Sequence, residues 1–359
     1  MHGMILSDIG YRAISLAGRW RQPGSMTTDT ADTTATTDTT GATASTMRAI
    51  RQDVLGGPEV LREVELPRPE PGTSQLLIRV HAAGINPTDW IHRATPGLHL
   101  PEPPFVLGWD VSGVVEEAGP GVTLFKPGDE VFGMLPYPHG HGSLATYVTG
   151  PARSFTHKPA GIDHVQAGAL PLAALTAWQA LVDTADIQAG QRVLIHAAAG
   201  GVGHLAVQIA KARGAYVIGT ASAAKHDFLR GLGADELIDY RSVDFAEAVR
   251  DVDVALDALG GEYGPRSMAT LRPGGLLVTI KFWGKDAQEL RAEAARRGVR
   301  VEALVVEADR AGMQAIADLA ASGRLVAHIA GTFPLAEAAK AHEVGEAGRT
   351  TGKLVITVP

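Results

Sequence analysis

The sequence predicts an α/β protein in which a β-rich part precedes a parallel sheet covered by helices. Between residue 47 and about residue 170, short apolar stretches alternate with Gly/Pro clusters, which is typical of sheets built from short strands. After about residue 170, strand-like stretches alternate with amphipathic helices. That alternation predicts a parallel sheet, because each return to the same edge requires a crossover helix.

The strands of the β-rich part are expected at 76–80, at 111–115 and, after the turn signal KPGD, at 130–132. The parallel sheet is expected to use strands at 192–196, 216–220, 236–239, 252–257, 276–280 and 301–306. Between the first two of these, apolar residues recur with the spacing of one buried helical face: Val202, Leu205, Ala206, Ile209 and Ala210. Helices near 309–322 and 335–347 and a strand at 353–358 complete the chain.

Residues 1–46 differ from the rest. Thr, Ala and Asp dominate residues 27–46, which offer almost no large apolar side chain to offset the entropy of ordering. Charged residues interrupt the short apolar patches of residues 1–25, so the apolar core of a signal peptide is missing. We predict a disordered extension over residues 1–46 and leave a weak targeting role open.

Composition and charge narrow the function classes. The 359 residues include 32 Lys and Arg against 39 Asp and Glu, and the formal net charge of −7 argues against nucleic acid as a partner. The chain has no cysteine, which excludes disulfides, a thiolate nucleophile and thiolate zinc ligands. We expect a cytoplasmic protein without a membrane span, since no run of about 18 apolar residues occurs.

The most informative segment is the loop between the strand at 192–196 and the helix that follows. Its residues, AAAGGVG at 197–203, are small, so the backbone can approach a pyrophosphate whose charge then lies on helix N–H groups. A tight strand-to-helix turn is the alternative, because the pattern departs from the usual Gly-x-Gly-x-x-Gly. The strand–loop–helix context favours a nucleotide site with these cofactor-binding residues: Ala199, Gly200, Gly201, Val202 and Gly203.

The end of the next strand predicts which dinucleotide binds. An NAD site would place a carboxylate there, but the sequence is GTASAAK at 219–225. The hydroxyl of Ser222 and the ammonium of Lys225 suit a 2′-phosphate, so NADPH is the expected cofactor. Tyr240 and Arg241, after the third strand, are placed to close over the same phosphate, and the alternative for Lys225 is a solvated helix residue.

Further motifs recur in one order along the chain: AGINPTD at 83–89, LGWDVSG at 107–113, PGDEV at 127–131, ALTAW at 174–178, LGAD at 232–235 and GK at 352–353. With the loop at 197–203 they resemble the medium-chain dehydrogenase/reductase superfamily, and within it the zinc-independent quinone oxidoreductase group. The resemblance implies a GroES-like β-rich catalytic domain, residues 47–170 and 309–359, interrupted by a Rossmann NADP-binding domain with a doubly wound parallel sheet, residues 171–308. The active site would be the cleft between these domains, and pairing of cofactor domains to a homodimer is left open.

Zinc-dependent alcohol dehydrogenases of this superfamily carry a cysteine where this chain has Asn86, and His-Glu where it has Trp109-Asp110. The cysteine-rich structural zinc loop has no counterpart at 133–137 either. We therefore expect no metal. Hydride transfer to a conjugated acceptor needs less electrophilic activation than hydride transfer to the isolated carbonyl group of an alcohol dehydrogenase substrate, since hydrogen bonds can stabilise the enolate. The resemblance thus predicts hydride transfer from NADPH to a small quinone or to the activated C=C bond of an α,β-unsaturated carbonyl compound.

By the same resemblance, Asn86 lies near the nicotinamide and the substrate, although a turn-capping role is the alternative. Asp89 is a further candidate for the catalytic site, and Tyr137, or one of His139 and His141, is the candidate proton donor if water is not. The implied cofactor contacts outside the glycine loop are Asn86, Thr176, Leu259, Gly260, Phe282 and Lys353.

Two alternatives stay open. An enoyl-thioester reductase of the fatty-acid or polyketide type shares hydride delivery to a conjugated double bond, although no clear basic patch for a phosphopantetheine is seen. A non-catalytic NADPH-binding sensor would bind the cofactor without turning over any electrophile.

The pair His139 and His141 is weak evidence for a metal site, because no further ligand is placed with it.

Overall fold

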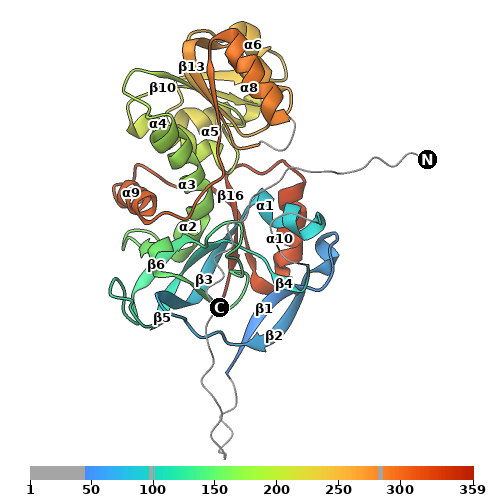
Figure 1. Ribbon diagram of the computed structural model, residues 1–359, viewed down its shortest axis with the longest axis vertical. Coiled ribbons are helices and arrows are strands. Elements are labelled where there is room, and N and C mark those ends of the chain that lie inside the picture. The colour runs from blue at the N-terminus through green and yellow to red at the C-terminus, as the bar shows by residue number, and fades with distance from the viewer. Residues whose placement is uncertain (1–44, 97–99, 101, 282–285) are drawn as a thin grey trace, which may run out of the picture. The chain divides into compact units, whose positions relative to one another are not determined.

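The computed structural model describes residues 45–96, 100, 102–281 and 286–359 (Figure 1). The predicted disordered extension lies outside this part of the chain except for its last two residues, and strand β1 begins at Thr46. Phe282, an expected cofactor contact, also lies outside the described residues. In the described part of the chain, none of the helices has the length and apolar character that a membrane crossing requires.

A six-stranded parallel sheet confirms the predicted α/β alternation. Its strand order is β11-β10-β9-β12-β13-β14, so β9 and β12 lie side by side where the winding direction changes. The strands are β9 (Arg192–Ile195), β10 (Tyr216–Ala221), β11 (Glu236–Asp239), β12 (Val252–Asp257), β13 (Leu271–Thr279) and β14 (Arg300–Ala303). In such sheets ligands bind at the carboxyl ends of the strands beside this switch point.

Two of these strands differ from their expected bounds by more than one residue. Strand β13 begins at Leu271, because Leu271 pairs with Val252 before a bulge interrupts the register. Strand β14 ends at Ala303 rather than Val306. Beyond it, Leu304, Val305 and Val306 leave the sheet to line a cavity described below.

Helices cover both faces of this sheet. They are α4 (Gly203–Ala212), α5 (His226–Gly231), α6 (Phe245–Ala248), α7 (Tyr263–Met268) and α8 (Asp286–Arg297). Alternate residues of β9 enter different cores: Val193 and Ile195 pack with α4, whereas Leu194 packs with Phe245 and Ala294. Figure 1 shows α4 and α8 on opposite sides of the sheet. The near-continuous apolar strands follow from burial on both faces.

The other part of the molecule is built on a seven-stranded sheet with the order β15-β16-β3-β5-β6-β8, in which β7 also pairs with β3. Its strands are β3 (Gln75–Ile85), β5 (Asp110–Ala118), β6 (Glu130–Met134), β7 (Tyr147–Pro151), β8 (Phe155–His157), β15 (Ile329–Pro334) and β16 (Lys353–Thr357). A three-stranded sheet adds β1 (Thr46–Gln52), β2 (Arg62–Pro67) and β4 (Phe105–Val106). The chain therefore returns to its first sheet at its end, as the resemblance implied.

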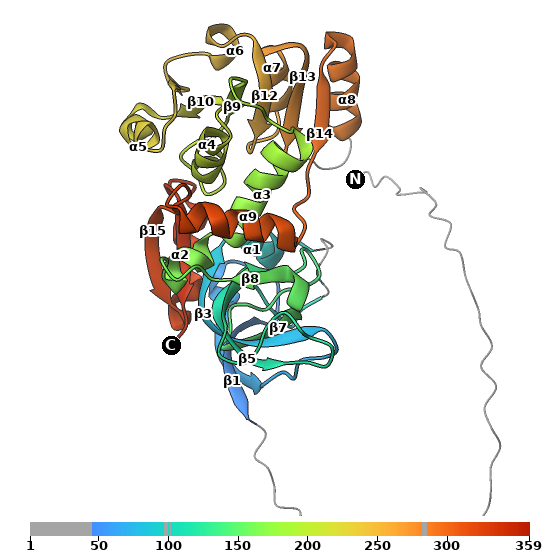
Figure 2. The same ribbon diagram turned by 90° about the vertical axis from the view of Figure 1, so that its left-hand side faces the viewer.

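The remaining helices pack on the seven-stranded sheet or on one another. They are α1 (Pro87–Ala94), α2 (His164–Ala169), α3 (Pro171–Trp178), α9 (Arg310–Ala321) and α10 (Ala338–Glu346). Helix α3 packs against α4, which covers the six-stranded parallel sheet. It also packs against α9, which lies beside it in Figure 2. Helix α1 packs against α10. One continuous apolar core runs through these contacts, from Ile78 of β3 to Val193 of β9.

Candidate functional site

The glycine loop between β9 and α4 has the geometry of a phosphate cradle. Ala197 has φ +48, and a Cβ on Gly203 would lie 2.3 Å from the Ala197 carbonyl oxygen, so the loop tolerates only glycine at that position. In the described part of the chain, the N–H groups of Gly201, Val202 and Gly203 have no acceptor. Orphan donors at the start of a helix bind anions well. The loop therefore fits a dinucleotide pyrophosphate.

His204 supports this loop from behind, and the sequence interpretation missed it. Its Nδ1 donates to the Gly200 carbonyl at 2.8 Å, and its Nε2 accepts from the His328 N–H at 3.1 Å. Burial lowers the pKa of His204 to about 4, so the ring is neutral and can make both bonds. The available signal was a histidine directly after the last glycine of the loop.

The predicted 2′-phosphate residues meet at the ends of two neighbouring strands. Ala221 pairs with Asp239, so Ser222 and Tyr240 leave β10 and β11 side by side. Ser222 is buried, whereas Tyr240 is 49% exposed. The ammonium of Lys225 donates to the Arg349 carbonyl at 3.4 Å, which brings the loop before β16 to the same edge. Sequence reasoning did not identify this approach of the Arg349 backbone to Lys225.

The loops after β12 and β13 are also at the carboxyl edge of the sheet. The buried Asp257 accepts from the Leu259 and Gly260 N–H groups at 2.8 and 2.9 Å. Gly260 has φ +74, and a Cβ there would lie 2.8 Å from the Lys281 Cβ. This close approach explains the glycine and places Lys281 at the mouth of the site.

A buried polar cluster joins the end of the chain to the start of α1. Register pairing of Leu354 with Ile85 sets Lys353 beside Asn86. The Lys353 ammonium donates to the Asn86 Oδ1 and, at 3.0 Å, to the Ile85 carbonyl, and it lies 3.5 Å from the Asp110 Oδ2. The Asn86 Nδ2 in turn donates to the Asp110 Oδ2 at 2.9 Å. The charge of Lys353, one of the implied cofactor contacts, lies within this cluster, and its stem approaches Gly201.

Asp110 and Asp89 hold the cluster in place. The Asp110 Oδ1 accepts from the Leu172 N–H at 2.6 Å and so connects β5 to the start of α3. The Asp89 Oδ2 accepts from the Asn86 N–H at 2.7 Å at the start of α1. Burial raises the pKa of both carboxyl groups, that of Asp89 to about 7. Asp89 lies behind Asn86 rather than on the surface of the site.

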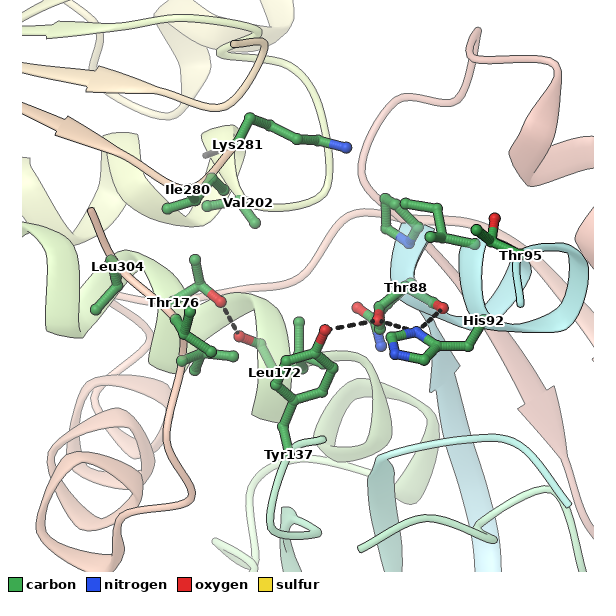
Figure 3. Close-up of a pocket in the computed structure, with 15 residues that line it drawn as sticks. Thr88, His92, Thr95, Tyr137, Leu172, Thr176, Val202, Ile280, Lys281 and Leu304 are labelled. Atoms are coloured by element: carbon green, nitrogen blue, oxygen red, sulfur yellow. Dashed lines mark hydrogen bonds between the residues drawn. The ribbon is translucent and has the colours of Figure 1, made fainter. Parts of the chain in front are cut away.

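A cavity of about 440 Å³ lies next to this cluster (Figure 3). Its walls come from α1, the loop after β6, α3, the start of α4 and the loops after β13 and β14. The lining residues are Asn86, Pro87, Thr88, Ile91, His92, Thr95, Tyr137, Leu172, Thr176, Val202, Ile280, Lys281, Leu304, Val305 and Val306. A cavity of this size, largely apolar with a few convergent polar groups, is typical of a small-molecule site.

The polar groups of the cavity form short hydrogen-bonded chains. The Thr88 hydroxyl donates to the Tyr137 hydroxyl oxygen at 3.2 Å and lies 3.0 Å from the His92 Nδ1 (Figure 3). The Tyr137 O–H is then left to donate into the cavity. Burial raises the pKa of Tyr137, which keeps that proton on the phenolic oxygen. The Thr176 hydroxyl donates to the Leu172 carbonyl at 2.7 Å, so its oxygen can accept from a ligand.

His141, which the sequence suggested as a proton donor, and the tryptophans Trp90 and Trp109 do not line this cavity. The His141 Nδ1 lies 2.7 Å from the Val106 carbonyl, and no group of three or more His, Asp or Glu in the described ranges is arranged to hold a metal. Trp109 is fully buried against His92 and Tyr137. Trp90 packs against His342, away from the cavity.

The sequence matches two known families. Residues 72–160 match the alcohol dehydrogenase GroES-like domain, and residues 232–356 match the family described as zinc-binding dehydrogenase. A 2-haloacrylate reductase from a Burkholderia species is 36% identical over 328 residues, which cover 84% of this chain and 96% of that protein. This chain belongs to the medium-chain dehydrogenase/reductase superfamily, in its quinone oxidoreductase-like group.

Solved structures of this group show the same fold. The quinone oxidoreductase of Coxiella burnetii has a TM-score of 0.82 at 37% identity and covers 88% of this chain and 100% of its own. The Escherichia coli quinone oxidoreductase, solved with NADPH, has a TM-score of 0.77 at 29% identity and covers 87% of this chain and 100% of its own. This member of the superfamily is therefore an oxidoreductase that uses a nicotinamide dinucleotide and a small-molecule substrate.

A mycocerosic acid synthase-like polyketide synthase of Mycobacterium tuberculosis is also related, with 36% identity over 320 residues that cover 85% of this chain. The chain spans only 15% of that much longer protein. The likeness is therefore to one segment of the synthase, and the synthase's activity as a whole does not transfer.

Proposed function

We propose that this protein is an NADPH-dependent, zinc-independent reductase that transfers hydride to quinones or to the activated C=C bond of α,β-unsaturated carbonyl compounds. The observation that carries the proposal is the cavity shared by two groups of residues. Val202, next to the glycine loop, and Thr176 line one side, and Tyr137 and Thr88 line the other. A nicotinamide ring held by the loop and an electrophile held by Tyr137 would meet in one enclosed space.

The cofactor supplies the hydride when bound, and the chain's own residues position both reactants. The Thr176 oxygen is available to accept from a carboxamide N–H. The Tyr137 O–H can donate to a carbonyl oxygen of the acceptor, and it gains acidity from the hydrogen bond that Thr88 donates to it. Addition of hydride at the β-carbon leaves an enolate, whose α-carbon then takes a proton from Tyr137 or from water.

Zinc independence is supported by what occupies the ligand positions of zinc-dependent members. Both atoms of the Asn86 amide are engaged, the nitrogen with Asp110 and the oxygen with Lys353. Trp109, where a histidine ligand would stand, is buried and has no ligating atom directed into the cavity. Lys353 also brings a positive charge into the cluster, which disfavours a second cation beside it.

The experiment that tests the function is a chelator-controlled assay of NADPH oxidation. 1,4-Benzoquinone, 9,10-phenanthrenequinone, a 2-alkenal, a simple enone and crotonyl-CoA are offered separately, each with and without chelator. Turnover of a quinone or enone that resists the chelator supports the proposal. Turnover of crotonyl-CoA alone would favour an enoyl-thioester reductase, a class that the likeness to the polyketide synthase segment keeps in view. NADPH binding without any turnover would favour a cofactor sensor.

The cofactor preference has its own variants in the same assay. We expect the double change Ser222→Ala and Lys225→Ala to raise the KM for NADPH by about tenfold to a hundredfold, because a charge-assisted contact to the 2′-phosphate is lost. The KM for NADH should change little, since NADH has no phosphate there. Equal effects on both cofactors would refute the assignment of Ser222 and Lys225.

A further inference from the structure

Lys281 is a cation at the mouth of the cavity that the proposed mechanism does not use. It follows β13 and the cavity-lining Ile280, and its own side chain also lines the cavity. Figure 3 shows this side chain extended away from the β13 backbone toward the side of the cavity where Thr95 lies. Its backbone is held by Thr279, whose hydroxyl oxygen accepts from the Lys281 N–H at 3.3 Å.

The ammonium of Lys281 has no hydrogen-bond or ion-pair partner among the described residues, in contrast to the buried Lys353. The other fourteen lining residues include no Asp, Glu, Arg or second Lys. Asp89 and Asp110 are buried behind Asn86, and Asp110 is compensated by Lys353. Asp257, Glu262, Glu289 and Glu293 line a neighbouring hollow that Lys281 also borders, but no carboxylate among the described residues lies within ion-pair distance of its ammonium. Among the described residues that line the cavity, Lys281 is therefore the one that offers a ligand a full charge, and that charge is positive.

Resting on the proposed reductase function, we propose that Lys281 selects substrates that carry a carboxylate in addition to the reacting enone. The carboxylate would pair with the ammonium at the mouth, while the enone extends between Tyr137 and Thr176. The reaction itself is unchanged: hydride adds to the β-carbon, the C=C π bond breaks toward the carbonyl, and the α-carbon takes a proton. The carboxylate keeps its charge throughout.

Apolar side chains of the same cavity make this pairing effective. Ile91 and Val305, at 37% and 57% exposure, lie at the open side of the cavity, and a bound ligand would cover them. Water is displaced when this surface is covered, so an ion pair formed there is screened less than one on the open protein surface. A neutral substrate of the same shape would gain the apolar contacts but not the ion pair.

The test compares an acid with its own ester. We would measure kcat and KM for (E)-6-oxohept-4-enoate and for its methyl ester, in which methylene groups separate the carboxyl group from the same reacting enone. We expect Lys281→Met to lower the acid-to-ester ratio of kcat/KM by about tenfold, mainly through the KM for the acid, because a charge-assisted contact is lost. Lys281→Arg should restore most of the ratio, and added salt should reduce it in the wild type.

The control variant is Lys340→Met, which removes one positive charge from the exposed face of α10. It should leave the ratio unchanged. An unchanged ratio in Lys281→Met would overturn the inference, and so would a matching rise in the KM for NADPH, which would assign Lys281 to the cofactor. Failure of the wild type to reduce either compound, or any quinone or enone of the first assay, would instead refute the proposed function.

Discussion

At the scale of single residues, the environment of Asp89 departs most from what its residue type suggests. It is fully buried, its Oδ2 accepts from the Asn86 N–H, and its Oδ1 has no hydrogen-bond partner among the described residues. Burial therefore raises the pKa of Asp89 from 3.8 to about 7, with a smaller contribution from the nearby charge of Asp110. The carboxyl group is protonated in the folded protein over a pH range in which it ionises in the unfolded chain.

This difference makes stability depend on pH. Between about pH 4 and pH 7 the folded state binds one more proton than the unfolded state at this position, so the unfolding free energy falls as pH rises. Asp89→Asn mimics the protonated group and removes this contribution. Between about pH 4.5 and pH 7.5, we expect the unfolding free energy of the wild type to fall by about 3 kcal/mol more than that of Asp89→Asn.

The measurement is chemical denaturation followed by circular dichroism at several pH values. Asp227→Asn is the control, because the side chain of Asp227 is 97% exposed and the change should leave the pH profile as it is in the wild type. Profiles of wild type and Asp89→Asn that run parallel would show that Asp89 is already ionised in the folded protein.

At the scale of elements, the loop between β9 and α4 depends on backbone approach rather than on side chains. A Cβ at Gly203 would lie 2.3 Å from the Ala197 carbonyl oxygen and 2.7 Å from the Ala198 Cα, and both are backbone atoms. These atoms can move only if the loop moves. The N–H groups that face a pyrophosphate would move with it.

Gly203→Ala should therefore raise the KM for NADPH and for NADH together, each by about tenfold or more, because the pyrophosphate is common to both cofactors. This pattern differs from the NADPH-specific effect expected for Ser222 and Lys225. The matched control is Gly231→Ala in α5, where an added Cβ meets nothing within 4 Å. That change should leave both KM values unaffected and stabilise the helix by up to about 1 kcal/mol. Normal cofactor kinetics in Gly203→Ala would contradict the assignment of the loop.

At the scale of the whole described unit, side chains of α4 connect the six-stranded parallel sheet to the part of the molecule built on the seven-stranded sheet. Gln208 donates to the Val326 carbonyl at 3.0 Å and accepts from the Val326 N–H at 2.9 Å. His204 accepts from the His328 N–H, and the Gly352 N–H donates to the Ala199 carbonyl at 3.0 Å. The helix that begins at the glycine loop is thus bonded to the chain segments around β15 and β16.

Gln208→Met keeps the side-chain volume but removes both hydrogen bonds to Val326. We expect the unfolding free energy to fall by about 1–3 kcal/mol, because the paired backbone groups lose their partner. The KM for NADPH should rise at the same time, since α4 carries the loop. Gln288→Met, on the exposed face of α8, is the control and should change neither quantity. A change in stability with an unaltered KM would show that the contact does not position the loop.

Local patterns in the sequence predicted the elements well, including the strand, small-residue loop and helix at 192–212. The strands at 236–239 and 252–257 have the predicted bounds, and α4 and α9 lie within a residue or two of theirs. This success has a physical reason: apolar periodicity, small residues and turn residues act over a few neighbouring positions. The resemblance added the order of the two domains, which periodicity alone does not contain.

Contacts between distant segments were decided only by the tertiary structure. Pairing of β16 with β3 brings Lys353 to Asn86, a partner that the motif at 352–353 alone did not indicate. The chain beyond β14 leaves the sheet and makes Val305 part of a cavity wall, and the end of β13 sets Lys281 at its mouth. No local pattern encodes these partners, because they depend on strand register and on packing between residues that are far apart in the sequence. The sequence by itself thus determined that the chain forms a nucleotide-binding α/β fold, and the tertiary structure decided which charges are neutralised and which one lines the cavity.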